Sequence, residues 1–337
     1  MTNQRYCKKL KAAKYYYNEN LTQQEVADRL YMSRPTVSKL LTEAKEEGIV
    51  QFKIVDIQNK CNMFALEDRL INTFSLKNAI VVDYDDSFDN LKDKIGQAAA
   101  EYFDDIVQNN MKIGFSWGTT LKAMVKNLNH SNNIKNLKLV TLVGGSGTFS
   151  ADVHSNIIIE NVLDKYDGEG HFLYAPVVVD NKDLKENLIN NTETKKLLNR
   201  AKIVEIAFVG IGSIQELAQR LDFNQQEMQE LKRYNAVGDI CSRFYDSDGK
   251  LCPTEINERI IGIDLESLRD IETVVGVAGG EGKVEAINAA LKGGFLDVLV
   301  TDKITAEKVL AKENTKSINR EESKNYESTR NERSRRL

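Results

Sequence analysis

The chain has 337 residues, of which 41% are hydrophobic and 28% charged, and its formal net charge is −4. These values are ordinary for a protein that buries a full apolar core. No apolar run in the sequence approaches the roughly 20 residues that cross a bilayer, so we exclude a membrane span and expect no membrane partner.

The N-terminal segment and the cysteines indicate the cellular compartment, and the histidines bear on metal binding. The N-terminal segment MTNQRYCKKLK has neither an apolar stretch nor a small-residue cleavage site, so we expect no secretory signal. The four cysteines are widely spaced without a C-x-x-C pair, which favours reduced thiols and a cytoplasmic location. The three histidines are too scattered for a zinc cluster, and we expect neither a metal ion nor a cofactor.

Charge is distributed unevenly along a chain whose length suits two domains. Residues 1–55 hold ten Lys or Arg and six Asp or Glu, an excess of +4, and the remainder carries −8. A basic head on an acidic body predicts that the head alone meets a polyanion, although so small a surplus also fits an ordinary surface. We predict a DNA-binding domain at 1–56, an effector-binding and oligomerisation domain at 57–312, and a polar, disordered tail at 313–337.

The first domain carries the signals of three short helices. Apolar residues recur every three or four positions over 6–18, which predicts a helix there. The segment Thr22-Gln23-Gln24-Glu25 has the spacing of a capping box, which predicts that a second helix begins at it. Ser33 is a good N-cap for a third helix from Arg34 to about Glu47, which Gly48 ends.

Two short helices joined by a tight turn are typical of a helix-turn-helix, and double-stranded operator DNA is the predicted partner. Arg34 can donate twice to a guanine edge, while Thr36 and Ser38 can reach bases or phosphates. Lys39 and the amides at the start of the second helix suit phosphates. The predicted DNA-binding residues are Gln23, Gln24, Ser33, Arg34, Thr36, Ser38 and Lys39. The alternative is a small helical bundle with a solvated polar face.

Two features follow the helix-turn-helix. Residues 49–55 alternate well enough to predict a short strand, which would make the motif a winged one. Residues 63–71 predict an amphipathic helix whose apolar face either docks on the body or pairs with a second copy of the chain.

The body alternates apolar strands with helices, which predicts an α/β fold with a doubly wound, largely parallel sheet. The predicted strands are 79–82, 113–115, 139–143, 172–174, 204–209, 274–277 and 298–300. The predicted helices are 89–109, 120–127, 153–165, 284–291 and 303–311.

Four of these strands end in loops rich in Gly, Ser and Thr that open a helix, at 116–120, 144–148, 210–213 and 278–283. Such loops offer amides and a positive helix end to an anion at the carboxyl edge of the sheet. Neither the P-loop pattern nor a dinucleotide fingerprint is present, because no Ser or Thr follows Lys283 and no G-x-G-x-x-G follows the first strand. The loops therefore favour a small phosphorylated ligand; alternatively, their glycines only make turns.

Several blocks of sequence resemble a known family. They are SRPTVSKLLTEAKEEGIV, SWGTT, NAVGDICSRFYDSDGK, INERIIGIDLESLR and VVGVAGGEGKVEAINAALKGGFLDVLVTD. Over about residues 5–311 the chain is similar to the SorC family of bacterial sugar-responsive transcriptional regulators, particularly to those of deoxyribonucleoside operons. The resemblance implies a phosphorylated sugar as effector and a homodimer or homotetramer that binds an operator.

The resemblance also implies site residues. Gly118, Thr119 and Thr120 match a phosphate-binding loop, and Asp239 matches an acid that accepts from sugar hydroxyls. Lys283 matches a lysine that meets a phosphate, although it also fits a solvated first-turn lysine, and Asp239 also fits a loop cap. The remaining residues that the resemblance implies are Gly144, Gly145, Ser146, His154 and Asn156.

One departure concerns covalent chemistry. Some members of the family carry a lysine beside the glycine pair, where it can form a Schiff base with an aldehyde sugar, and this chain has Val143 there. Reversible binding of another phosphorylated sugar or polyol is therefore favoured over covalent capture of deoxyribose phosphate. A sugar-phosphate isomerase or aldolase with a DNA-binding head is the alternative to a regulator, but the sequence shows no paired catalytic constellation.

Overall fold

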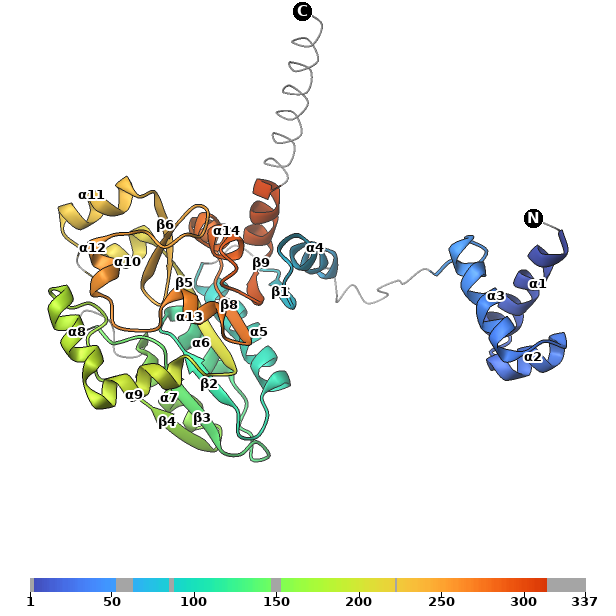
Figure 1. The fold of residues 1–337 in the computed structure, drawn as a ribbon, viewed down its shortest axis with the longest axis horizontal. Coiled ribbons are helices and arrows are strands. Elements are labelled where there is room, and N and C mark those ends of the chain that lie inside the picture. The colour runs from blue at the N-terminus through green and yellow to red at the C-terminus, as the bar shows by residue number, and fades with distance from the viewer. Residues whose placement is uncertain (1–2, 53–62, 85–87, 147–152, 222, 314–337) are drawn as a thin grey trace, which may run out of the picture. The chain divides into compact units, whose positions relative to one another are not determined.

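The structure is a computed structural model that describes residues 3–52, 63–84, 88–146, 153–221 and 223–313. The chain divides into two compact units, residues 1–62 and residues 63–337 (Figure 1). The boundary predicted between residues 56 and 57 lies outside the described residues, as does the predicted tail beyond Glu313. Among the helices described, none combines the length and the apolar character that crossing a membrane requires.

The N-terminal unit, residues 1–62, folds as a short helical array. Its elements are α1 (Asn3–Ala13), the π-helical turn η1 (Lys14–Asn18), α2 (Gln23–Leu30) and α3 (Arg34–Glu46). The predicted capping box is confirmed: the Glu25 N–H donates to Thr22 Oγ1 (3.3 Å) and the Thr22 N–H donates to the Glu25 carboxylate (2.7 Å). Ser33 is confirmed as the N-cap of α3, and Gly48 follows its last turn at φ 72°.

A small core and two ion pairs hold these helices together. Ala12, Val26 and Val37, one from each helix, are completely buried against one another. The acidic end of α3 is tied to α1, because Arg5 pairs with Glu43 (2.6 Å) and the buried Lys9 pairs with Glu47. The start of α3, where the predicted DNA-binding side chains lie, is left at the surface.

The strand predicted at 49–55 is wrong over 49–52, and residues 53–55 lie outside the described residues. After Gly48 the chain turns back, and the Val50 N–H donates to the Ala44 carbonyl (3.0 Å). Ile49 and Val50 pack against the helical core instead of extending. Apolar residues at alternate positions here reflect packing onto α3, because no strand among the described residues lies beside them.

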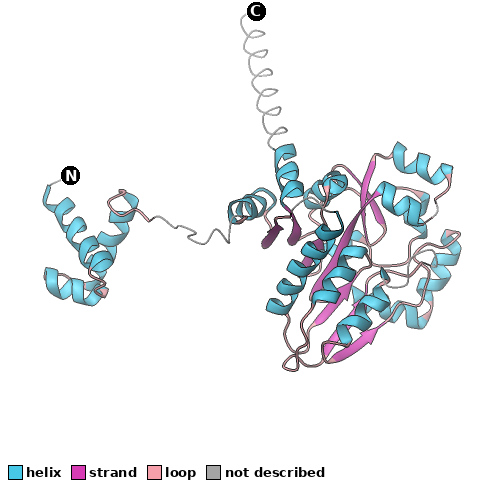
Figure 2. Ribbon diagram, turned by 180° about the vertical axis from the view of Figure 1, so that it is seen from behind, coloured by secondary structure: helices cyan, strands magenta, loops and turns pink. Residues whose placement is uncertain are grey.

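The C-terminal unit, residues 63–337, is an α/β domain around a twisted sheet (Figure 2). Its main path has the order β1-β9-β8-β5-β2-β3-β4 with every neighbouring pair parallel, which confirms the predicted doubly wound sheet. These strands are β1 (Asn78–Val82), β2 (Lys112–Phe115), β3 (Leu137–Thr141), β4 (Gly168–His171), β5 (Ile206–Ser213), β8 (Thr273–Val277) and β9 (Val298–Asp302). An antiparallel hairpin of β6 (Ala236–Ile240) and β7 (Arg243–Asp246) extends from the end of β5.

Helices cover both faces of this sheet. They are α4 (Phe64–Phe74), α5 (Phe88–Ile106), α6 (Thr119–Asn127), α7 (Ser155–Leu163), α8 (Lys182–Asn190), α9 (Thr192–Ala201), α10 (Ile214–Arg220), α11 (Gln225–Arg233), α12 (Glu255–Arg259), α13 (Leu265–Arg269), the 3-10 turn η3 (Glu281–Lys283), α14 (Val284–Lys292) and a last helix over 303–313. Alternate residues of β5 point to opposite sides: Phe208 joins the core under α5, α6 and α7, and Ala207 and Val209 join the core under α4 and α14. The near-continuous apolar strands are therefore buried on both faces.

Two local expectations fail. The strand predicted at 172–174 is wrong, because β4 occupies Gly168–His171. This segment lacks alternating apolar residues, and it forms a strand by pairing with β3 at the edge of the sheet. The β6–β7 hairpin is missing from the predicted elements. Its two-residue turn places Cys241 and Ser242 at φ 51° and 63°, so the glycine or asparagine that usually marks such a turn is lacking.

The winding of the chain reverses between β2 and β5. From β2 the chain proceeds outward to β3 and β4, whereas from β5 it proceeds in the other direction to β8 and β9. Ligands of open α/β sheets bind outside the carboxyl ends of the strands at such a switch point. The topology thus selects the space between the ends of β2 and β5.

Candidate functional site

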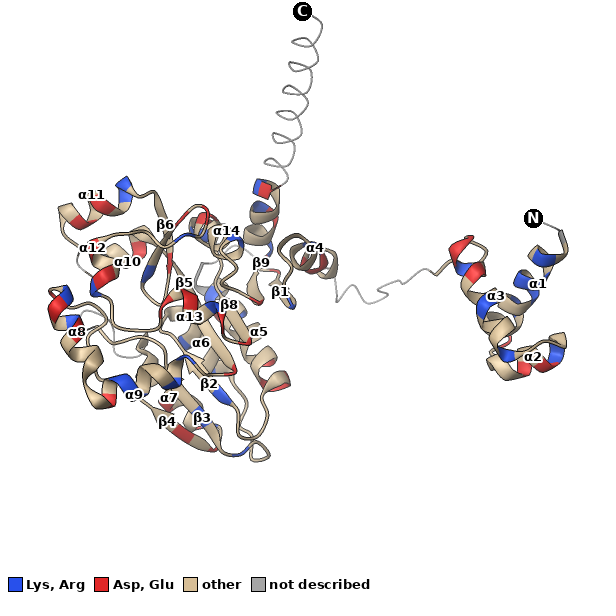
Figure 3. Cartoon of the chain, in the orientation of Figure 1, with Lys and Arg blue, Asp and Glu red and all other residues tan. Residues whose placement is uncertain are grey.

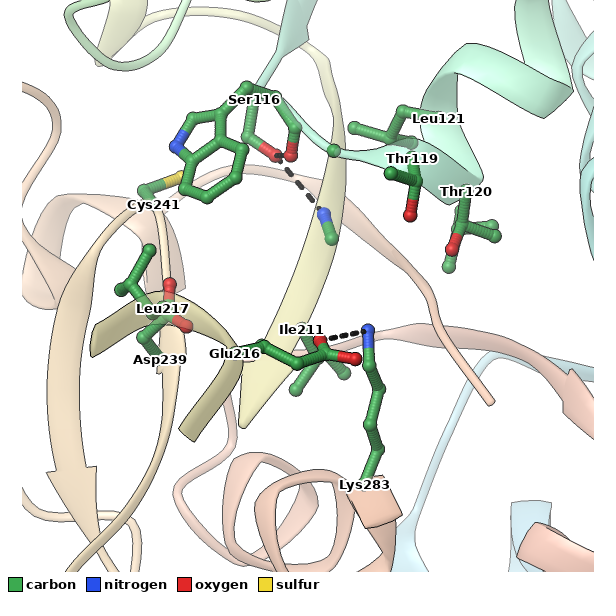
Figure 4. A pocket seen from close by; sticks show the side chains of 15 residues that line it. Ser116, Thr119, Thr120, Leu121, Ile211, Glu216, Leu217, Asp239, Cys241 and Lys283 are labelled. Carbon is green, nitrogen blue, oxygen red and sulfur yellow. Dashed lines mark hydrogen bonds and ion pairs between the residues drawn. The ribbon is translucent and has the colours of Figure 1, made fainter. Parts of the chain in front are cut away.

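A pocket lies at this switch point (Figure 4). The space between its walls measures about 490 Å³, including the part open to solvent. Three of the four predicted loops reach it, through residues 116–121, residues 210–212 and Lys283, and the β6–β7 hairpin adds Asp239 and Cys241. The loops thus come together because parallel strands end at the same edge of the sheet.

The start of α6 forms one wall. Gly118 precedes the helix at φ 148°, a conformation that favours glycine. Because glycine has no side chain, the first turn of α6 has no side-chain cap. Thr119 and Thr120 occupy the first helical positions and line the pocket. Their hydroxyls and the amides of this turn are the groups that bind a phosphate at a helix start.

Lys283 lies across from that wall and is largely buried, with 15% of its side chain exposed. Its ammonium is 3.3 Å from the carboxylate of Glu216 on α10, and Figure 4 shows the two side chains pointing toward each other. Burial lowers the pKa of Lys283, and the negative charges of Glu216 and Asp239 oppose that shift. The pocket therefore contains a desolvated cation whose charge its own walls partly neutralise.

Asp239 lines the pocket from strand β6 and is 4% exposed. Its carboxylate accepts from the Ser242 N–H (3.2 Å), which helps to fix the turn of the hairpin. Gly212 faces it across the strand pair, and a Cβ there would lie 2.0 Å from Asp239 Oδ1. Asp239 is thus a capping group of the hairpin, and it also lines the pocket.

Trp117 and Ser116 connect the two sides. The Trp117 indole N–H donates to Ser242 Oγ (3.2 Å), and the Gly210 N–H donates to Ser116 Oγ (3.0 Å). The end of β2 is therefore fastened to β5 and to the hairpin. Trp117 is the single tryptophan of the chain, so its fluorescence reports on this pocket alone.

The other implied effector residues form a separate group. Gly144 and Gly145 do not line the pocket, and their N–H groups donate to the carbonyls of Ile261 and Ala175 (3.0 Å each). Ser146, His154 and Asn156, which belong to this group, do not line the pocket either. Loop 147–152 between them lies outside the described residues.

One contact links this group to the pocket. The Gly118 N–H donates to the carbonyl of Val153 (3.1 Å), the residue before His154. The structure thus brings Gly118, Thr119, Thr120, Asp239 and Lys283 into one pocket. The other five implied effector residues do not line it.

Two family blocks serve as scaffold. Arg243, buried between the hairpin and residues 257–263, donates to the carbonyls of Asn257 (2.6 Å), Ile260, Gly262 and Ile263. Burial lowers its pKa. Asp302, at the end of the last family block, accepts from the Gly280 N–H (2.7 Å) and from Thr305, so it fixes the 278–283 loop.

The sequence did not single out Cys241, Trp117 or Glu216 as ligand residues, although all three line the pocket. Cys241 carries no sequence signal, because the hairpin that places it was not predicted. Trp117 stands inside the SWGTT block, next to the implied phosphate loop. Ser213 and Glu216 have the S-x-x-E spacing of a capping box, which points to a structural role rather than to a ligand site.

The DNA-binding residues predicted on the N-terminal unit share one region. Arg34, Thr36, Lys39, Ser33 and Gln24 are exposed, and Gln23 and Ser38 are partly buried. The Ser33 and Thr36 hydroxyls bond to each other (2.7 Å), so both serve the helix cap. Along α3 the basic Arg34 and Lys39 come before the acidic Glu43 and Glu46, and Lys45 lies in the last turn (Figure 3).

Tyr31 is an additional candidate for the interface. It lies in the turn between α2 and α3 at φ 55°, and 96% of its surface is exposed. Residues other than glycine are uncommon in this conformation, and the exposed ring is accessible to a partner of this unit. Its position one turn before Arg34 suits contact with a DNA backbone.

Known proteins combine the same two kinds of unit in one chain. A family model of a sugar-binding domain matches residues 58–311, and a model described as winged helix-turn-helix DNA-binding matches residues 16–51. The chain belongs to the SorC family of transcriptional regulators. The resemblance read from the sequence blocks is thereby confirmed.

Two curated relatives cover most of the chain. It is 33% identical over 300 residues to the deoxyribonucleoside regulator of Bacillus subtilis, and the match covers 88% of this chain and 95% of that protein. It is 32% identical over 306 residues to the sorbitol operon regulator of Klebsiella pneumoniae, which spans 89% and 96%. The two identities are so similar that they do not distinguish one effector class from the other.

Solved structures agree. The full-length sorbitol operon regulator SorC from Klebsiella pneumoniae superposes with a TM-score of 0.71 at 30% identity, covering 92% of this chain and all of that one. A transcriptional regulator from Streptococcus pneumoniae gives 0.71 at 35% identity over 75% and 98% of the two chains. Because the relatives are regulators, this SorC-family protein is a DNA-binding transcriptional regulator, and the isomerase or aldolase alternative is not supported.

Proposed function

We propose that the pocket binds a phosphorylated sugar or polyol, and that this effector changes the affinity of the N-terminal unit for the operator of a carbohydrate or nucleoside operon. The observation that carries the proposal is the pocket at the strand switch point. It brings together the open first turn of α6, the ammonium of Lys283 and the carboxylate of Asp239. Amides, hydroxyls and a lysine suit a phosphate, and a carboxylate accepts from sugar hydroxyls.

The named relatives support the class of operon. One is named a deoxyribonucleoside regulator and another a sorbitol operon regulator, and both names point to compounds with a sugar or polyol part. The lysine and the open helix start that line the pocket support a ligand with negative charge. Val143 stands where covalent capture would need a lysine, and it is buried, so we propose reversible binding.

The effector proposal is tested with a panel of phosphorylated sugars and polyols and their unphosphorylated parents. Trp117 fluorescence and thermal unfolding report binding, and a ligand at one hundred times its Kd adds about 2.7 kcal/mol of stability. We expect phosphorylated members to bind and their parents to bind at least tenfold more weakly. Equal affinity of the two forms contradicts a phosphate site.

On DNA, we propose that Arg34 reads a base edge, that Lys39 and the amides of Gln23 and Gln24 bind phosphates, and that Tyr31 packs on the backbone. An electrophoretic mobility shift with DNA upstream of the gene tests this. Affinity should fall steeply between 50 and 200 mM salt, because neutralised phosphates release counterions. No retardation at low salt contradicts it.

Regulation requires that the effector bind the DNA-competent and DNA-incompetent forms with different affinity. We propose that the chain acts in the cytoplasm as a homodimer or homotetramer, whose paired N-terminal units read two half-sites. Light scattering with and without effector, together with operator titrations, tests the coupling. If effector changes neither the assembly state nor the operator affinity, the coupling fails while DNA binding stands.

A further inference from the structure

The cation that would meet the effector's phosphate is held by a carboxylate of the same chain. Lys283 Nζ lies 3.3 Å from Glu216 Oε2, and both residues line the pocket. Lys283 is 15% exposed and Glu216 39% exposed, so the pair is only partly screened by water. A ligand phosphate and Glu216 therefore compete for the same ammonium.

Glu216 has an alternative environment at the start of its own helix. Ser213 is the N-cap of α10, and its hydroxyl accepts from the Glu216 N–H (3.4 Å), as in half of a capping box. At Thr22–Glu25 and at Asn224–Glu227, the glutamate at the matching position turns back and closes the box. The carboxylate of Glu216 instead reaches across the pocket to Lys283 (Figure 4).

This second environment is favourable for a carboxylate. The first turn of a helix carries positive partial charge, so an acidic side chain that withdraws from Lys283 is stabilised there. The start of α10 thus offers Glu216 a second, weaker place for its charge when another anion occupies Lys283. A dianionic phosphate near Lys283 repels the carboxylate and shifts the balance toward its own helix.

We propose that Glu216 is the internal competitor of the effector's phosphate for the ammonium of Lys283 and thereby lowers the affinity of the pocket for that phosphate. It holds Lys283 in the structure described here and gives it up to a phosphate. A neutral sugar hydroxyl cannot replace a charge-assisted ion pair, so an unphosphorylated sugar leaves Glu216 in place. This inference rests on the proposed effector function.

The test uses the full-length protein at pH 7.5, inorganic phosphate as the probe and Trp117 fluorescence as the readout. Glu216→Gln keeps the size of the side chain and removes its charge. We expect it to bind phosphate about tenfold more tightly than the wild type, because the phosphate then has no charge-assisted ion pair to displace; tenfold in Kd is about 1.4 kcal/mol.

The matched control is Glu281→Gln. Glu281 lies two residues before Lys283, and it pairs with Lys308 (2.6 Å) at the surface without lining the pocket. Its replacement removes the same charge from the same neighbourhood. We expect its Kd for phosphate to stay within about twofold of the wild type, because a screened surface charge contributes little.

A double-mutant cycle shows whether the effect passes through the lysine. In a Lys283→Gln background, Glu216→Gln should tighten binding much less than in the wild type, because only the direct repulsion between the carboxylate and the phosphate is then removed. A tightening of the same size without Lys283 overturns the proposal, since it does not pass through the lysine.

The remaining outcomes separate this inference from the effector function. If the wild type and Glu216→Gln bind phosphate with equal affinity, or the variant binds more weakly, the inference fails and Glu216 is a neutral wall or a ligand contact. If no variant binds phosphate or any phosphorylated sugar, the effector function itself fails, and the inference falls with it.

Discussion

The two units display positive charge in opposite ways. On the N-terminal unit, Arg34 and Lys39 are exposed at the start of α3, while the acidic end of that helix is neutralised by α1. In the C-terminal unit, Lys283 and Arg243 are buried, and each is matched by a carboxylate or by carbonyls of its own domain. An exposed charge suits a polymer read at its surface, and a buried one suits a small ligand that must be desolvated. Substitution of Arg243 should therefore lower stability and substitution of Lys283 should lower ligand affinity. Substitution of the exposed Arg34 should lower DNA affinity alone.

The largest effect is expected from Arg243→Met. It leaves four backbone carbonyls without their donor, and we expect a loss of about 3–5 kcal/mol in unfolding free energy, as when one partner of a buried charged pair is removed. Urea denaturation followed by Trp117 fluorescence measures this. The control Arg269→Met removes an exposed guanidinium that donates to the Gly293 carbonyl, and it should cost under about 1 kcal/mol. Equal losses in the two variants would show that burial of Arg243 is not what matters.

Lys283→Gln tests the buried lysine through the affinity for the effector. Removing one member of a buried charged contact typically costs about 2–5 kcal/mol, so the affinity for the phosphorylated effector should fall at least 30-fold. Operator binding without effector should be unchanged. Isothermal titration and mobility shifts measure the two quantities, with Lys308→Gln as the surface control. Retained affinity in Lys283→Gln would mean that the helix start alone holds the phosphate.

Arg34→Ala probes the exposed unit. If it reads a guanine, its loss costs about 1–3 kcal/mol of operator affinity and relaxes sequence choice at one base pair. The thermal stability of the protein should not change, because the side chain is exposed. Lys11→Ala, an equal charge change at the end of α1, should leave base preference intact. A binding screen with single-base operator variants distinguishes the two.

Tyr31→Gly is expected to have the smallest effect. Glycine adopts φ 55° freely, and this gain offsets the added flexibility of the unfolded chain, so stability should stay within about 1 kcal/mol. DNA affinity should fall severalfold as the ring contact is lost, whereas Tyr31→Phe should retain most of it. Wild-type affinity in Tyr31→Gly would remove Tyr31 from the interface.

The sequence was informative where a local rule decides the structure. The capping box at Thr22, the N-cap at Ser33 and the strand-end loops follow from side-chain chemistry over a few residues, and the structure has them. The pocket at β2 and β5 was also foreseeable, because parallel strands deliver their loops to one edge.

Non-local contacts account for what was missed. The edge strand at 168–171 depends on β3 rather than on its own pattern, and the hairpin turn at Cys241 is imposed by packing against β5. The partner of Lys283 was equally invisible, because Glu216 lies 67 positions away and obeys a spacing that normally serves its own helix. Gly144 and Gly145 satisfy the glycine pattern of a ligand loop, yet their amides bind backbone carbonyls.

Strand β5 has a mechanical consequence. Its first residues belong to the parallel sheet, since Ile206–Gly210 pair with β8, and its last residues, Ile211–Ser213, pair with the hairpin that carries Asp239. One uninterrupted backbone thus runs from the rigid centre of the domain into the wall around the ligand. That wall has no hinge of its own at this strand, and a displacement of the hairpin would have to be transmitted along β5 rather than absorbed locally.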